Sequence, residues 1–100
     1  MTLRFSWDAN KAASNKRKHG VSFETAARVF SDPFAFSEQD RIEDSEYRWQ
    51  TIGSVEGVVI LFVAHTVADE GDAELIHIIS ARKAERNERK RYEQEKYRQI

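Results

Sequence analysis

The residues of this chain best suited to act on a phosphate group are a few arginines, lysines, glutamates and histidines. A basic run starts at Arg82, directly behind a short apolar segment, and continues through Lys83 and Arg86. A planar guanidinium can hold a phosphate with two parallel hydrogen bonds. If the apolar segment is a strand, its rigid backbone positions Arg82 better than a loop would. Arg82 is therefore a candidate phosphate-binding residue, with a cationic flank behind it.

A second candidate pair lies in the alternating segment from Glu46 to Ile52. Period-two alternation places Glu46 and Arg48 on one polar face of a strand. The pair equally fits an ordinary surface ion pair that contributes little. In the last strand, the same alternation predicts one side carrying Ile76, Ile78, Ser80 and Arg82, and another carrying Leu75, His77 and Ile79.

Three histidines could transfer protons. His77 lies within an apolar run, which predicts a hydrogen-bonded core histidine. His65 stands at the end of a predicted strand and is expected to be exposed. His19 precedes a glycine, so it is either a proton acceptor or simply a residue that favours a helix C-terminus.

The sequence predicts neither a metal site nor a cofactor. The histidines lack ligand spacing, there is no cysteine and no HExxH motif, and the acidic stretch 40–46 lacks the glycine of a calcium loop. An enzyme built from these residues would cleave a phosphodiester without metal. In RNA the 2′-hydroxyl can attack the adjacent phosphate, which requires only a base, an acid and cations around the developing charge.

These candidates depend on a predicted α+β architecture. Asp8 and Ser22 are typical N-caps for helices over 9–18 and 23–30, and Gly20 is a typical stop. Residues 34–46 predict a short strand followed by an acidic loop. The remaining predicted elements are a short strand at 3–7, an antiparallel meander of 47–53, 58–66 and 74–81, and a basic C-terminal helix from residue 83. Two N-terminal helices would cover one face of the sheet and leave the other partly open.

Length and charge bound the possible functions. One hundred residues predict a single domain over 1–100. Residues 1–20 and 82–100 each carry a net charge of +4, whereas residues 21–81 carry −9. A globule that brings its ends together would present a cationic face to RNA or to an acidic protein. With no signal peptide and no long apolar run, we expect a cytoplasmic protein with no membrane partner.

Four ordered motifs, F-x-W-D, K-H-G-V-S-F-E, E-x-R and I-I-S-A-R, carry a resemblance to a known family. The stretches "FSWDANKAASNKRKHGVSFETAARVFSDP", "EDSEYRWQTIG" and "IHIISARKAERNERKRYE" resemble the BrnT family of bacterial toxins from about Phe5 to Glu93. The resemblance implies a fold similar to the RelE superfamily and a ribonuclease toxin of a type II toxin–antitoxin module. It also implies a small BrnA-like antitoxin that binds DNA, represses the shared operon and forms a hetero-oligomer with the toxin.

Residue by residue, the resemblance extends to Lys11, Lys18, His19, Glu46, Arg48, Arg82 and Arg86. It implies that Arg82 holds the scissile phosphate with help from Arg48 and Arg86, and that Glu46 or His19 accepts the proton. Lys83 fits the basic residue after "SAR", and the expected RNA-binding residues are Lys11, Lys18, Lys83 and Arg86. The antitoxin is expected to bury the open sheet face or the last helix and to cover Arg82.

Two other functions fit the same residues. The chain could be a non-catalytic module that binds RNA or the ribosome and inhibits by occlusion, or a protein-interaction domain whose cationic face binds an acidic partner. RNA cleavage in the presence of a chelator would distinguish the metal-independent ribonuclease from both of these alternatives. Salt-dependent RNA binding without cleavage would favour the occluding module.

Overall fold

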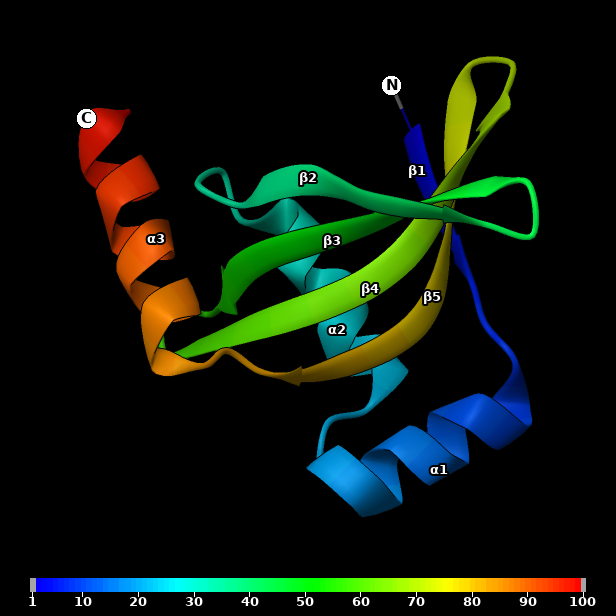
Figure 1. Cartoon of the computed structure of the whole chain (residues 1–100), viewed down its shortest axis with the longest axis horizontal. Helices are drawn as coiled ribbons and strands as arrows, with labels where there is room; N and C mark the ends of the chain where they lie inside the picture. The colour runs from blue at the N-terminus through cyan, green and yellow to red at the C-terminus, as the bar shows by residue number, and fades with distance from the viewer. Residues whose placement is uncertain (1, 100) are drawn as a thin grey trace.

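The body of the computed structural model, which describes residues 2–99, is a five-stranded sheet in the order β1-β5-β4-β3-β2 (Figure 1). Neighbours among β2 to β5 pair antiparallel, which confirms the predicted meander. The first strand, however, pairs parallel with β5, so the sheet is mixed. The strands are β1 (Thr2–Ser6), β2 (Phe36–Glu43), β3 (Glu46–Val55), β4 (Val59–Glu70) and β5 (Ala73–Lys83).

The expected acidic loop within residues 34–46 is wrong, because most of it is strand β2. The loop itself is only Asp44 and Ser45, both with positive φ, as a two-residue hairpin turn requires. As an edge strand, β2 can expose its carboxylates to water while its backbone pairs with β3. The acidic composition therefore led to a loop being predicted where the chain forms a strand with mostly exposed side chains.

The helices begin and end where the cap residues predict. Asp8 accepts hydrogen bonds from the first-turn backbone of α1 (Ala9–His19), and Gly20 ends that helix at φ 72°. Ser22 caps α2 (Phe23–Ala27), but the expected longer helix then tightens into the 3₁₀ segment η1 (Arg28–Ser31). Short side chains and caps thus set both helix starts locally.

The core lies between the sheet and the segment α2–η1, behind the sheet in Figure 1. We call this side of the sheet the helix face and the opposite side the open face. Gly53 permits the close approach, since a Cβ there would stand 2.8 Å from both Val29 and Ala35. The core residues are Val21, Phe23, Ala26, Val29, Val55, Leu61, Val63, Ile76, Ile78 and Ala81.

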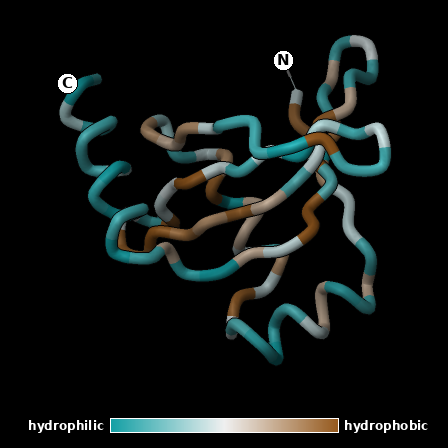
Figure 2. Tube along the Cα trace, viewed as in Figure 1, coloured by the Kyte–Doolittle hydropathy of each residue, from teal (hydrophilic) through white to brown (hydrophobic). Residues whose placement is uncertain are grey.

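The last helix, α3 (Arg86–Arg98), lies across one end of the sheet, beside the ends of β3 and β4 (Figure 1). Figure 2 shows α1 and α3 as largely hydrophilic and the central strands as the apolar part of the trace. Within residues 2–99, no helix has the length and apolar character needed to cross a membrane.

Candidate functional site on the open sheet face

Cross-strand pairing arranges the open-face side chains in rows that run across the sheet. The four-strand row nearest α3 joins Phe36, Ile52, Phe62 and Arg82, one row from the pair Ser54 and Ile60 that lies against α3. The next rows, toward the hairpin turns, hold Glu38, Gln50, Ala64 and Ser80; then Arg41 and Arg48, with Thr66 and His77; then Glu43 and Glu46. Since residues of one strand rise about 3.3 Å each, neighbouring rows lie roughly 7 Å apart.

A β-bulge in β5 determines which side chains reach this face. Ala64 pairs with Ser80 and His65 pairs with Ile78, so Ile79 is an extra residue in β5. The extra residue reverses the alternation beyond it. The predicted grouping of Ile78 with Ser80 and Arg82 is therefore wrong. Arg82 and Ser80 share the open face with His77, while Ile78 faces the core.

Arg82 lies at the end of β5 with its guanidinium already bound by a carboxylate. It donates two hydrogen bonds to Glu88 of α3, at 2.8 and 3.0 Å. Its planar group also lies over the Phe62 ring, 4.2 Å from the centroid. The hydrogen bonds from Arg82 lower the pKa of Glu88 despite burial, and Glu88 raises the pKa of Arg82. Both charges therefore persist at neutral pH.

Further polar contacts fix α3 against the sheet. Arg91 forms an ion pair with Glu38 of β2, and Glu38 also accepts a hydrogen bond from Gln50 at 3.0 Å. Tyr92, which is buried, donates to Asp32 at 2.6 Å. Burial alone would raise the pKa of Asp32, but hydrogen bonds from Ser54, Tyr92 and Phe34 lower it. Polar contacts therefore hold α3 against the sheet.

Arg48 is half-buried at the centre of the open face and is only weakly paired. Its Nε lies 3.9 Å from a Glu43 oxygen, and this buried nitrogen has no hydrogen-bond partner within residues 2–99. A buried unsatisfied donor costs free energy. Arg48 thus differs from Arg82 in having no close carboxylate partner.

The two candidate bases lie in different places. Glu46 is exposed beside the β2–β3 turn, three rows and roughly 20 Å along the sheet from Arg82. His19 is half-buried at the end of α1, and it lines a hollow of about 200 Å³ with Ser80, one row from Arg82. The structure therefore brings His19 close to Arg82 and leaves Glu46 near Arg48.

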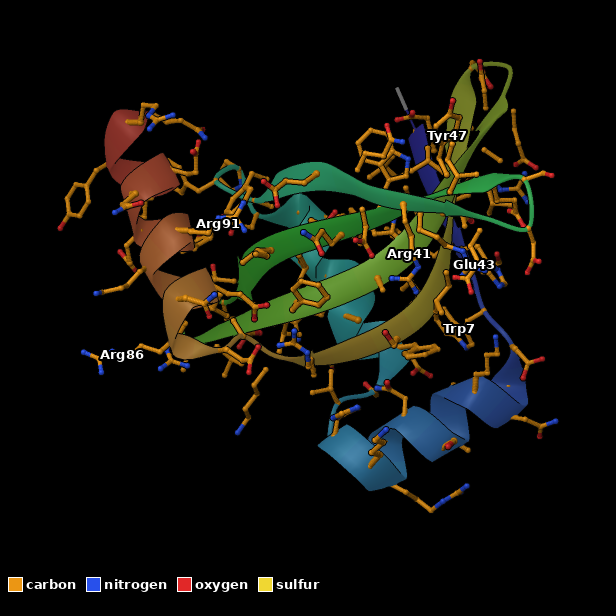
Figure 3. The ribbon with its side chains drawn as sticks, viewed as in Figure 1. Trp7, Arg41, Glu43, Tyr47, Arg86 and Arg91 are labelled. Carbon is orange, nitrogen blue, oxygen red and sulfur yellow. The ribbon has the colours of Figure 1, made fainter. Side chains whose placement is uncertain are left out.

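The four candidate RNA-binding residues also separate. Lys11 and Lys18 line the same hollow as His19. Arg86 projects from the start of α3 into solvent (Figure 3). Lys83, in contrast, lies on the helix-face side, where it lines a groove with Lys16 of α1. Three of the four therefore border the open face or its helical flank.

Two histidines exchange the environments that the sequence predicted. His65 was expected to be exposed but is 2% exposed, with Nε2 2.7 Å from Thr51 Oγ1. Burial lowers its pKa. His77 was expected in the core but lies half-buried on the open face, with Nδ1 2.8 Å from Ser6 Oγ. The His65 prediction failed because strand β4 continues past it to Glu70, and the His77 prediction failed because the apolar run around it alternates between the core and the open face.

Asn15 is a buried residue that sequence reasoning missed. Its amide nitrogen donates to the carbonyls of Val21 and Ala81, and its oxygen accepts from the Ala81 backbone at 3.1 Å. These bonds hold α1 against β5 immediately before Arg82, so Asn15 positions His19 relative to the open face. A polar residue in an alanine-rich helix gives no sequence signal for this role. Across residues 2–99, no three histidine or acidic side chains are grouped closely enough to hold a metal ion.

Comparison of the fold identifies a bacterial toxin of the same architecture. The 1.1 Å crystal structure of the Brucella abortus ribonuclease toxin BrnT matches with a TM-score of 0.62 and 24% sequence identity. The match covers 86% of this chain and 100% of that chain. At this identity the likeness establishes the fold.

The sequence comparison establishes the family. The protein-family model described as "Ribonuclease toxin, BrnT, of type II toxin-antitoxin system" matches residues 7–88. The chain therefore belongs to the BrnT family of ribonuclease toxins, whose type II systems pair each toxin with an antitoxin. A search of curated proteins finds no match.

Proposed function

We propose that this chain is a metal-independent endoribonuclease that cleaves RNA on the open face of its sheet and thereby stops translation. The observation that carries the proposal is the placement of Arg82, at the end of β5 with its guanidinium on the sheet face opposite α2–η1, where α3 covers only one end. Family membership supplies the ribonuclease class. Arg48 in the centre of the same face supplies a second guanidinium.

The proposed chemistry needs only groups of this chain and of the RNA. The 2′-hydroxyl attacks the adjacent phosphorus and the bond to the 5′-oxygen breaks, leaving a 2′,3′-cyclic phosphate and a 5′-hydroxyl that takes its proton from water. A base takes the 2′ proton, and arginine hydrogen bonds stabilise the charge that grows on the phosphorane oxygens. His19 is the favoured base if Arg82 binds the scissile phosphate, because it lies one row away. Glu46 is favoured if Arg48 does.

The flanking cations would bind RNA beyond the scissile bond. Lys11 and Lys18 lie beside the Ser80 end of the open face, and Arg86 extends the cationic surface along α3. Each phosphate contact adds affinity that depends on salt. Lys83 faces the other side and would contribute only to RNA that passes around α1.

The partner proposed for this toxin is a BrnA-like antitoxin that binds DNA and represses the operon encoding both proteins. Membership in a type II family supports an antitoxin partner. The two chains would form a hetero-oligomer, in which the toxin is inactive.

Purified protein incubated with RNA in excess chelator tests the activity directly. We expect internal cleavage with 2′,3′-cyclic phosphate ends, and a comparable rate when magnesium replaces the chelator. His19→Ala and Glu46→Gln assayed side by side identify the base, since loss of a general base lowers the rate by roughly 10²-fold or more. Salt-sensitive RNA binding with no cleavage in either buffer would refute the enzyme.

One observation favours a non-catalytic alternative. Glu88 accepts one hydrogen from each terminal nitrogen of Arg82, and the Lys83 carbonyl accepts another, so a phosphate must displace this carboxylate or use the remaining Nε–H and Nη2–H. If the ion pair never opens, the open face would bind RNA or the ribosome without chemistry. The same chelator assay separates the two functions.

A further inference from the structure

A second uncovered surface lies on the helix face, at the end of the sheet near the hairpin turns. Leu3, Ile42, Tyr47 and Val67 are 37, 61, 56 and 36% exposed there. Ile42 pairs with Tyr47, and strand alternation places both on the opposite side of the β2–β3 hairpin from Arg41 and Glu43. Figure 3 shows Tyr47 on the other side of the hairpin from Arg41 and Glu43. With the half-buried Trp49, these side chains form what we call the distal apolar patch.

The patch surrounds a hollow of about 320 Å³. Its walls include Leu3, Trp49, Val67 and Phe30. The polar groups beneath satisfy one another, because Ser37 Oγ lies 2.7 Å from Thr51 Oγ1, which lies 2.7 Å from His65 Nε2. The hollow therefore suits apolar side chains and demands no polar partner from them.

Carboxylates border the patch on two sides. The β4–β5 turn, residues 69–74, carries four acidic residues and no lysine or arginine. The β2–β3 turn region, residues 40–46, carries four acidic residues and Arg41 alone. These residues are Asp69, Glu70, Asp72 and Glu74, and Asp40, Glu43, Asp44 and Glu46. Among them, Glu70 is paired with Arg4, and Glu43 and Glu46 lie on the open-face side of their hairpin.

This acidic border selects the class of occupant. A second copy docked about a two-fold axis would place identical acidic turns near each other, which like charges disfavour. RNA is repelled for the same reason. The surface fits a protein segment whose apolar side chains are flanked by lysines or arginines.

We propose that the distal apolar patch is the docking surface for the antitoxin, through a segment of apolar residues flanked by basic ones. The inference uses the antitoxin partner that the family implies and does not depend on cleavage by the open face. A segment seated here leaves Arg82 exposed, in contrast to the expectation from sequence that the antitoxin covers it. Inhibition then requires a further part of the antitoxin to pass around the β2 edge.

Affinity for the antitoxin encoded in the same operon, purified separately, tests the surface. The double variant Ile42→Ser/Tyr47→Ala should bind roughly 30-fold more weakly or worse, as for loss of interface hot spots. Val58→Ser is the matched control, because Val58 is 81% exposed in the β3–β4 turn, away from the patch, and should bind normally. Asp72→Asn/Glu74→Gln should weaken binding and flatten its salt dependence. Circular dichroism checks folding, and Val67→Lys provides an independent variant.

Two outcomes overturn the proposal. Normal affinity in the double variant, with affinity lost in Arg91→Ala, would place the antitoxin on the open face. A dimer of the toxin alone that Ile42→Ser/Tyr47→Ala dissociates would make the patch a self-interface. RNA cleavage by the free wild type is measured alongside, so a failure of the proposed activity leaves the docking result standing.

Discussion

Arg82 and Arg48 lie on the same sheet face but in opposite electrostatic situations. Arg82 has a bidentate carboxylate partner and an aromatic ring beneath it. Arg48 has a buried nitrogen with no hydrogen-bond partner in residues 2–99 and a carboxylate only at 3.9 Å. The guanidinium at the α3 end contributes to the fold, whereas the central one carries an unpaired donor.

The difference teaches that position and availability are separate requirements for a phosphate-binding arginine. Arg82 is better placed, beside the His19 hollow, but two of its five N–H groups already bind the Glu88 carboxylate. Arg48 has no tightly bound carboxylate to displace, because the nearest carboxylate oxygen is 3.9 Å from its Nε. Experiments at the α3 end must therefore separate chemistry from helix anchoring, and those at the centre need not.

The largest effect is expected from Arg82→Ala. If Arg82 stabilises charge that appears in the transition state, cleavage should fall roughly 10²-fold or more. RNA affinity should fall far less, since the other cations supply the salt-dependent contribution. Arg82→Lys should not restore the rate, because an ammonium lacks the bidentate geometry. Cleavage rate, RNA affinity and thermal unfolding of each variant are the measurements.

Glu88→Gln is the matched control for helix anchoring. It removes the same ion pair from the other side, yet keeps an oxygen for the Glu85 backbone and leaves Arg82 in place. Cleavage by Glu88→Gln should equal or exceed that of the wild type, and Arg98→Ala should change little. Equal losses in Arg82→Ala and Glu88→Gln would show that Arg82 serves only to hold α3.

A smaller effect is expected from Arg48→Ala, about tenfold on cleavage, as for one lost hydrogen bond to a charged group. Thermal stability should not decrease, since the substitution removes a buried donor that lacks a partner. Arg41→Ala is the comparison variant, because Arg41 occupies the paired position on β2 but is already bound to Asp40. A clear loss of stability in Arg48→Ala would mean that its guanidinium is better satisfied than the geometry indicates.

The smallest effect is expected from changing the pH near neutrality, which should leave the anchoring of α3 unchanged. The pKa of Glu88 and that of Glu38 are lowered from 4.5, chiefly by hydrogen bonds from Arg82 and Arg91. A lowered folded pKa stabilises the fold above the unfolded value, and this stabilisation is lost as pH falls through the folded value. Helix α3 should therefore stay anchored from pH 8 to 5 and loosen below 4.5. Hydrogen exchange of α3 amides measures this, and loosening between pH 8 and 6 would contradict it.

Local chemistry made much of the fold predictable. Asp8, Ser22 and Gly20 mark helix ends through bonds to their immediate neighbours, and period-two alternation located the three meander strands. Features that depend on pairing were not predictable in this way. The parallel partner of β1, the acidic strand β2 and the bulge at Ile79 all arise from contacts between distant segments.

The candidate site was predictable in its residue types and less so in its arrangement. The basic segment behind β5 and the polar face of β3 were anticipated from Arg82 and Arg48. The pairing of Arg82 with Glu88 was not anticipated, because a charged helix does not indicate which of its carboxylates will bind the preceding strand. Asn15 and His77 were missed for the same reason, since their roles come from Ala81 and Ser6, each more than 60 residues away.

The extra residue in β5 behaves like a frameshift in the strand. Removing one residue between His77 and Arg82 would restore strict alternation and turn the arginine inward, to the place where Ala81 is 1% exposed beside Asn15. Neither a charged group nor its hydration shell fits there. Natural variation in this toxin should therefore tolerate length changes in the β4–β5 turn but conserve the number of residues in this stretch, even where the residues themselves differ.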